Sequence, residues 1–200
     1  FASGSVLEEI EDGAFFVKAN DVYAGETTNS IQPALTNLSL PNTVKVIGDR
    51  AFVNQINLVS ANLGNAIEII DDIAFAGSSK LTNLTFGEYL KTIGDQAFKN
   101  CDITNMIDIP LNLGNNLTYL GSEAFSHNEN LKQVKIGRNL PSIGSFAFNY
   151  CSALTSVTIS NSVTSIGDVA FDATAWYDNQ PDGLVYNGKV LYKYKGEMPE

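Results

Sequence analysis

The chain has 200 residues, of which 44% are hydrophobic and 17% are charged, and its formal net charge is -10. An acidic surface repels phosphate groups, so we expect no nucleic-acid partner. No apolar run reaches the length of about 18 residues that a transmembrane helix needs, which excludes such a span within this chain.

An Ala-Phe pair recurs at a nearly constant interval. The six copies end at Phe52, Phe75, Phe98, Phe125, Phe148 and Phe171, so the steps are 23, 23, 27, 23 and 23 residues. A fixed period of this length is typical of a solenoid, because each repeat can bury its apolar side only against its neighbours. We therefore expect about six to seven stacked repeats in one elongated domain.

Each repeat contains two short extended segments and a corner. Alternation in Val157-Thr158-Ile159 predicts a first strand with one buried side, and Val44-Lys45-Val46-Ile47 predicts a second strand. The glycine after the second strand, such as Gly48, is expected to let the chain turn tightly. The Ala-Phe corner is too short for a free helix and predicts one helical or 3-10 turn. The expected fold is a mainly β solenoid with ladders of Phe and Ile side chains.

Two repeats are irregular. The fourth has four additional residues, and because residues 107–110 still resemble the first strand, we expect the insertion within 111–116. Residues 10–15 form a degenerate first copy, followed by an inserted loop near 16–34. We expect the solenoid to cover residues 1–175.

The segment 176–200 has a different pattern. Asn187-Gly188 lies between two runs rich in β-forming residues, which is a strong signal of a β-hairpin. Trp176 and Tyr177 precede these runs. We expect the hairpin to shield the last coil of the solenoid.

The residues from Leu154 to Phe171 closely resemble the BspA-like leucine-rich repeat family, and the resemblance extends over about residues 31 to 175. The family resemblance implies secreted or cell-surface proteins of host-associated bacteria and some protists, with roles in adhesion and no catalytic activity. In such proteins a similar hairpin is usually followed by further repeats. We therefore expect this chain to be a piece of a longer protein.

The two cysteines, Cys101 and Cys151, occupy equivalent positions two repeats apart. Strands stack about 4.8 Å apart, so the two Cα atoms should be roughly 10 Å apart, beyond the limit of about 7 Å for a disulfide. We expect free, buried thiols that behave as small hydrophobic groups.

Candidate chemical sites are few. His127 has no Cys, Ser or second His at an equivalent position, which indicates a surface histidine. Gly183 and Gly188-Lys189 have the spacing of a phosphate-binding loop, but Val190 replaces the required Ser or Thr. A column of aspartates either caps the corner turns, which we favour, or holds a cation. It contains Asp49, Asp72, Asp95 and Asp168. We expect no catalytic residues, no metal and no cofactor.

The outward side of the first strands is a repeated, mainly uncharged surface, and it is the predicted binding face. Its central residues are expected to be Asn83, Thr85, Asn105, Met106, Asp108, Lys132, Gln133 and Lys135. Trp176 and Tyr177 offer a second, aromatic contact. We expect a monomeric, non-catalytic adhesion module for a host or cell-surface protein or glycan. The alternative is a passive spacer within a longer surface protein.

Overall fold

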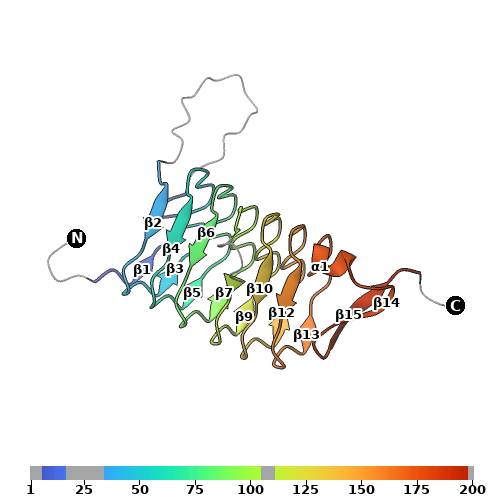
Figure 1. The fold of residues 1–200 in the computed structure, drawn as a ribbon. Helices are drawn as coiled ribbons and strands as arrows, with labels where there is room; N and C mark the ends of the chain where they lie inside the picture. Colours follow the sequence, from blue (N-terminus) through green and yellow to red (C-terminus); the bar gives the residue numbers. More distant parts are fainter. Residues whose placement is uncertain (1–5, 17–33, 105–110, 198–200) are drawn as a thin grey trace, which may run out of the picture.

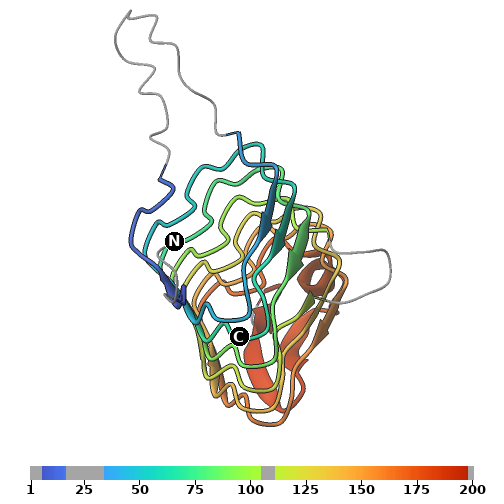
Figure 2. The ribbon, with the colours of Figure 1, turned by 90° about the vertical axis from the view of Figure 1, so that its left-hand side faces the viewer.

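The computed structural model describes residues 6–16, 34–104 and 111–197, which wind into coils stacked along one axis (Figure 1). Viewed nearly along the stack, successive coils follow the same path (Figure 2). Paired residues of neighbouring coils, such as Val46 and Ile69, are equivalent positions of the repeat. The predicted mainly β solenoid is therefore confirmed, as is its repeat of about 23 residues.

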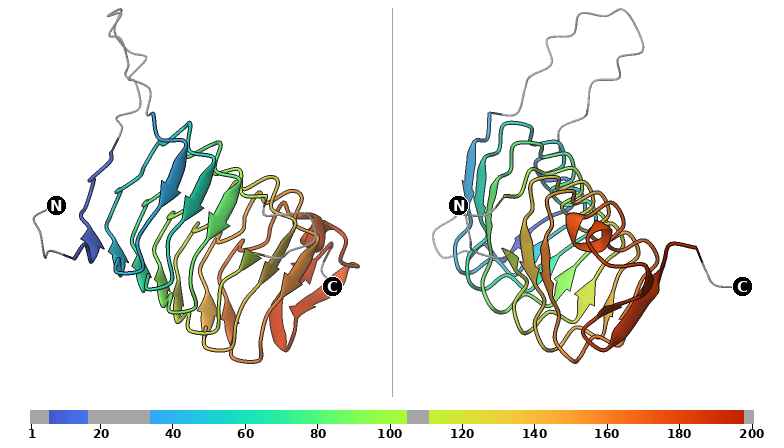
Figure 3. Two further views of the ribbon diagram at one scale, coloured as in Figure 1. Left: turned by 60° about the vertical axis from the view of Figure 1, so that its left-hand side comes forward. Right: turned by 45° about the vertical axis from the view of Figure 1, so that its right-hand side comes forward.

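The first strands of the coils lie side by side on one side of the stack (Figure 3). They are β2 (Asn37–Ser39), β4 (Ser60–Asn62), β6 (Asn83–Thr85), β8 (Leu111–Asn112), β10 (Gln133–Lys135) and β12 (Ser156–Thr158). β2, β4 and β6 form one parallel sheet, and β8, β10 and β12 form another. Inward side chains such as Leu84 and Val134 are buried between more exposed neighbours, which is the predicted alternation.

The second strands form the other sheets. They are β1 (Glu9–Ile10), β3 (Val46–Ile47), β5 (Ile69–Ile70), β7 (Thr92–Ile93), β9 (Tyr119–Leu120), β11 (Ser142–Ile143) and β13 (Ser165–Ile166). β1, β3, β5, β7 and β9 make a five-stranded parallel sheet, and β11 pairs with β13. Because Ile10 pairs with Ile47, the degenerate first copy stacks in register with the next coil.

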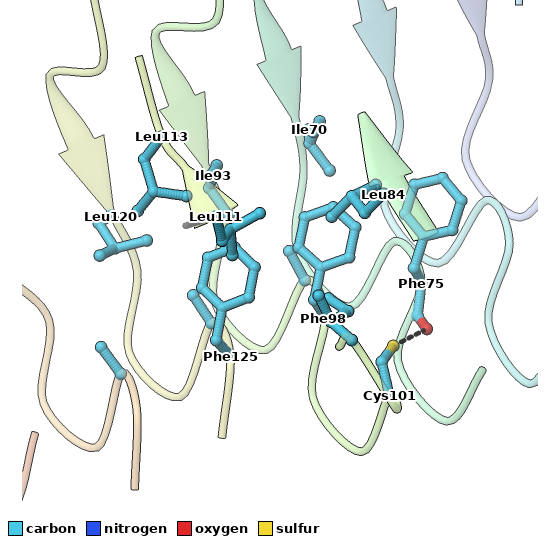
Figure 4. Packing of buried hydrophobic residues seen from close by; sticks show 14 of the residues in the cluster. Ile70, Phe75, Leu84, Ile93, Phe98, Cys101, Leu111, Leu113, Leu120 and Phe125 are labelled. Atoms are coloured by element: carbon cyan, nitrogen blue, oxygen red, sulfur yellow. Dashed lines mark hydrogen bonds between the residues drawn. The ribbon is translucent and has the colours of Figure 1, made fainter. Parts of the chain in front are cut away.

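A ladder of phenylalanine rings fills the interior (Figure 4). The six predicted rings, from Phe52 to Phe171, are completely buried. Consecutive rings are nearly parallel, with centroids 5.0 to 5.6 Å apart, and Phe15 stacks on Phe52 at 4.9 Å. Stacked rings bury a large apolar area, so the ladder is a major source of stability.

The corners differ in detail from the predicted helical turn. The N–H groups of Gln96, Phe98 and Asn100 donate to carbonyl groups of the next coil at 2.8 to 3.0 Å. The N–H groups between them close local turns, and Gln96 and Asn100 have φ of 57° and 55°. A continuous helical hydrogen-bond pattern is impossible here because alternate N–H groups are used between coils.

The glycine after the second strand has a different role from the predicted one. Gly94 does not adopt positive φ. A Cβ atom on Gly94 would lie 2.5 Å from Oδ1 of Asp72 and 2.6 Å from its backbone nitrogen in the preceding coil. Glycine is required because neighbouring coils approach too closely for a side chain, and not because of the turn itself.

The predicted position of the insertion in the fourth coil is wrong. Leu111 of β8 pairs with Val134 of β10, so the first strand of the fourth coil begins where the insertion was expected. The additional residues therefore precede Leu111. The physical reason is that Leu111 and Leu113, which are buried, keep the regular spacing to the next coil. Residues 107–110, expected to form the strand, lie outside the described residues.

A short helix and a hairpin follow the last coil. They are α1 (Ala175–Asp178), β14 (Gly183–Asn187) and β15 (Val190–Lys195), and β14 pairs with β15 as predicted. The rings of Trp176 and Tyr192 meet Phe171 edge-on, with centroids at 5.1 and 5.7 Å. These contacts cover the last ring of the ladder. In the part of the chain that the structure describes, no helix is long and apolar enough to cross a membrane.

The ladder predicts the effect of removing one ring. Phe98→Ala should lower the free energy of unfolding by about 3–5 kcal/mol, because the two neighbouring rings cannot close the cavity. Phe146→Ala is a matched control, since Phe146 is 41% exposed at a corner, and it should cost less than about 1 kcal/mol. Urea denaturation of both variants measures the difference. Similar losses in the two variants would contradict the proposed importance of the ladder.

Candidate functional site

The outward positions of the first strands form rows across the coils. In one row Ser39, Asn62 and Thr85 are directly paired, and in its continuation Lys135 pairs with both Asn112 and Thr158. These are the side chains that the alternation places outward. The structure therefore presents a polar face whose composition changes from coil to coil.

The structure brings some of the predicted binding residues onto this face. Asn83 and Thr85 are exposed on β6, and Lys135 is exposed on β10 beside the half-buried Gln133. Lys132 is exposed immediately before β10. Asn105, Met106 and Asp108 lie outside the described residues. Asn112, which the sequence reasoning missed because it misplaced the insertion, represents the fourth coil.

Polar side chains in the first three coils bond to one another across the face. Ser60 Oγ donates to Asn37 Oδ1 at 2.6 Å, and Thr85 Oγ1 donates to Asn62 Oδ1 at 3.4 Å. Lys80 Nζ donates to the side-chain oxygen of Asn57 at 2.9 Å. Part of the hydrogen-bonding capacity of this region is therefore already used within the protein.

Lys132 and Lys135 differ from the basic residues that form ion pairs. Within the described ranges, five other basic side chains form ion pairs. These pairs are Lys45 with Glu8, Lys91 with Glu68, Lys99 with Glu123, Lys193 with Asp172, and Arg50 with Asp49. Neither Lys132 nor Lys135 contacts a carboxylate of the described residues. No described carboxylate therefore neutralises either ammonium group.

Trp176 and Tyr177, the predicted aromatic contact, lie at the C-terminal end of the stack. Besides its contact with Phe171, the half-buried Trp176 lies 6.4 Å from the ring of Tyr192. Tyr177 packs edge-on against Tyr192 at 5.8 Å, and Lys193 Nζ lies 4.9 Å from the Tyr177 ring centroid. Both rings therefore take part in closing the stack.

The two cysteines are free and buried, as predicted, but they also donate hydrogen bonds. Cys101 Sγ donates to the carbonyl of Phe75 at 3.3 Å (Figure 4). Cys151 Sγ donates to the carbonyl of Phe125 at 3.2 Å. Burial raises the pKa of the Cys151 thiol to about 12, so it remains protonated and is a poor nucleophile. The arrangement therefore gives both thiols a structural role.

The hydrogen bond of the cysteines is a property of their position in the repeat. Ser78 and Asn128 occupy the equivalent position and donate to the carbonyls of Phe52 and Phe98 at 3.3 and 2.8 Å. In each case the carbonyl belongs to the Phe of the preceding coil. Sequence reasoning missed this role, although the shared ability of Ser, Cys and Asn to donate was visible in the alignment of repeats.

The column of aspartates caps backbone groups, as favoured, but those of the next coil. Oδ1 of Asp72 accepts the N–H of Asp95 at 2.7 Å, and Oδ1 of Asp95 accepts the N–H of Ser122 at 2.7 Å. Asp12 accepts the N–H of Asp49 at 2.9 Å in the same way. No three His, Cys, Asp or Glu side chains of the described residues gather closely enough to hold a metal ion.

Asp71 interrupts this arrangement because it replaces the glycine found in the five other regular repeats. Asp71 Oδ1 itself accepts the N–H of Asp72 at 2.9 Å, in place of the carboxylate of Asp49. The buried Oδ1 of Asp49 has no hydrogen-bond partner among the described residues. Burial, with the charges of Asp12, Asp72 and Asp71, raises the pKa of Asp49, although the charge of Arg50 opposes this.

The remaining motifs have structural roles. His127 is half-buried and stacks on the ring of Tyr150 with centroids 4.6 Å apart. Gly183 and Gly188, which suggested a phosphate-binding loop, lie at the start of β14 and in the hairpin turn. A hairpin cannot provide the helix N-terminus on which phosphate binding by such a loop depends.

Known proteins resemble this chain in sequence and fold. A family model described as "BspA type Leucine rich repeat region" matches residues 29–114 and 108–178, with 6 copies. A leucine-rich repeat protein from Bacteroides ovatus is 25% identical, with a TM-score of 0.60 over 72% of this chain and 43% of that protein. A leucine-rich repeat protein from T. pallidum is 21% identical, with a TM-score of 0.71 over 87% of this chain and 73% of that protein. No curated protein matches the chain.

The raised pKa of Asp49 predicts a pH effect. The folded state holds the Asp49 proton more tightly than the unfolded chain does, so this group lowers stability as pH rises from the ordinary pKa to the raised one. Asp49→Asn removes that loss. The free energy of unfolding of the variant relative to the wild type should therefore increase with pH above about 4 and then level off.

Urea denaturation of both proteins between about pH 3 and pH 7 measures this difference. Asp71→Gly is the companion variant, because it restores the space for the Asp49 carboxylate to accept the N–H of Asp72. NMR titration should then show a lower pKa for Asp49. If the free energy of unfolding of Asp49→Asn relative to the wild type stayed constant or fell with pH, the pKa of Asp49 would not be raised in the folded protein.

Proposed function

Because this chain belongs to the BspA-type leucine-rich repeat family, we propose that it is a non-catalytic binding module that presents its polar sheet face to a protein or glycan. The observation that carries the proposal is the pair of exposed lysines at β10, neither of which meets a carboxylate of the described residues. Lys135 lies on the row of outward polar side chains, and Lys132 lies immediately before the strand. The proposed location is the cell surface or the space outside the cell.

The rigidity of the scaffold supports this role. Gln133 and Lys135 belong to β10, which pairs on both sides with β8 and β12. A strand held on both sides loses little conformational freedom when a partner binds, so weak individual contacts can still be productive. Rows of similar groups on successive coils also allow a long ligand to bind at several points.

The proposed face extends from Asn83 and Thr85 on β6 to Lys132, Gln133 and Lys135 at β10. Asn105, Met106 and Asp108 remain predicted members of it, although the structure does not describe them. Trp176 and Tyr177 form the proposed second contact at the end of the stack, in addition to their packing role.

The alternative function is that of a spacer within a longer surface protein. This chain spans 43% of the length of the Bacteroides ovatus protein, which allows for further parts. A spacer needs only the regular stack and makes no use of free charges on one coil. Ligand binding separates the two functions directly.

Reversing the two charges tests the binding face. The wild-type protein is screened against an array of glycans and extracellular-matrix proteins, and Lys132→Glu/Lys135→Glu is then tested against each ligand found. The variant should bind at least about tenfold more weakly, because like charges then face each other across the contact.

The matched control is Lys45→Glu/Lys91→Glu, which changes the net charge equally but on the other side of the coils, where both lysines are ion-paired. The control should bind within about twofold of the wild type, since exposed ion pairs contribute little. Equal losses in both variants would move the contact away from this face, for instance to Trp176. Failure of the wild type to bind any ligand of the array would favour the spacer.

A further inference from the structure

Three exposed basic residues follow one another along a single coil. Lys132 precedes β10, Lys135 ends it, and Arg138 lies in the turn that leaves it. None of them contacts a carboxylate of the described residues, whereas most other basic side chains do. In a protein with a net charge of -10, this cationic strip is a local exception.

The backbone holds the strip in an extended line. Lys132 immediately precedes β10 and Lys135 ends it, and three residues of extended chain span about 10 Å. Gly137 then packs directly against the fourth coil, because a Cβ atom there would lie 1.9 Å from the carbonyl oxygen of Gly114. Arg138 directly follows Gly137, whose position is fixed by this close contact. The three charges are therefore presented by a backbone that cannot easily change its path.

The strand positions on either side of β10 carry no charge where they are described. Asn112 and Thr158 flank Lys135 in the strand register, and Ser156 lies opposite Gln133. The nearest carboxylate earlier in the same coil is that of Glu129, three residues before Lys132. The strip therefore consists of separated positive charges with neutral amide and hydroxyl groups beside them.

We propose that the cationic strip binds an acidic polysaccharide that lies along β10; this inference rests on the proposed binding function and names its ligand. A polyuronate or sulfated glycan carries anionic groups at regular intervals along a hydroxyl-rich chain. The spaced cations match the anionic groups, and the flanking Asn, Gln, Ser and Thr side chains match the hydroxyl groups.

A protein ligand fits this surface less well. The centres of protein interfaces are rich in Trp, Tyr and buried apolar groups. Lys135 and the side chains that flank it offer none of these among the described residues, and the exposed aromatic residues Phe146 and Tyr150 lie at the Ala-Phe corner. A single-stranded nucleic acid also fits less well, because the side chains that flank Lys135 include no aromatic ring on which bases could stack.

Isothermal titration calorimetry with defined polymers tests the inference. The probes are polygalacturonate, heparin, neutral dextran and a single-stranded oligonucleotide. The wild type should bind polygalacturonate or heparin, with an affinity that falls as NaCl is raised, and should not bind dextran. Lys132→Gln/Lys135→Gln/Arg138→Gln should reduce the affinity about tenfold or more.

The matched control is Lys45→Gln/Lys91→Gln/Lys189→Gln, which removes the same number of charges from other exposed positions. It should stay within about twofold of the wild type, and circular dichroism checks that both triple variants are folded. Equal losses in the two variants, or equal binding of the oligonucleotide, would overturn the inference. If the protein binds proteins or neutral glycans of the array but none of the acidic polymers, this inference fails and the binding function stands. If nothing binds in either experiment, both fail.

Discussion

Rows of backbone hydrogen bonds join consecutive coils and place equivalent side chains directly above one another. These bonds run through the strands and also through the corners, where Phe98 donates its N–H to the carbonyl of Ala124. The ring of Phe98 therefore meets Phe75 on one side and Phe125 on the other, with centroid distances of 5.3 and 5.2 Å. The ladder exists because the backbone register places each ring directly above the equivalent ring of the next coil.

The same register determines the structural role of a side chain at each position of the repeat. A thiol at Cys101 and an amide at Asn128 perform one task, which is to satisfy the carbonyl of the Phe in the preceding coil. Glycine at position 94 leaves room for the carboxylate of Asp72, and that carboxylate caps the next coil. Asp71 breaks the pattern and supplies its own cap, but leaves a neighbouring oxygen without a partner.

Regular stacking also shapes how a solenoid can bind a partner. The inward positions must be nearly identical from coil to coil, whereas the outward positions are free to differ because they face solvent. The differences between coils therefore lie mainly in the outward residues, and the fifth coil differs from the others by Lys132, Lys135 and Arg138. A rigid backbone beneath such groups fixes their spacing, which favours a ligand with its own regular repeat.

The period of the Ala-Phe pair was sufficient to predict the solenoid, the phenylalanine ladder and the free cysteines. These features depend only on the spacing of equivalent residues, which can be read along the chain. The hairpin at Asn187-Gly188 was predictable for the similar reason that its turn is local.

Other features were decided only by contacts between coils. The strand of the fourth coil was misplaced because residues 107–110 and Leu111 to Leu113 have similar apolar patterns, and pairing with Val134 selected the second. The role of Gly94 and the absence of a helical corner depend on how closely the neighbouring coil approaches. The availability of Lys132 and Lys135 likewise depends on which charges lie beside them. A one-dimensional pattern states which residues are equivalent, but distances between coils determine what each equivalent residue does.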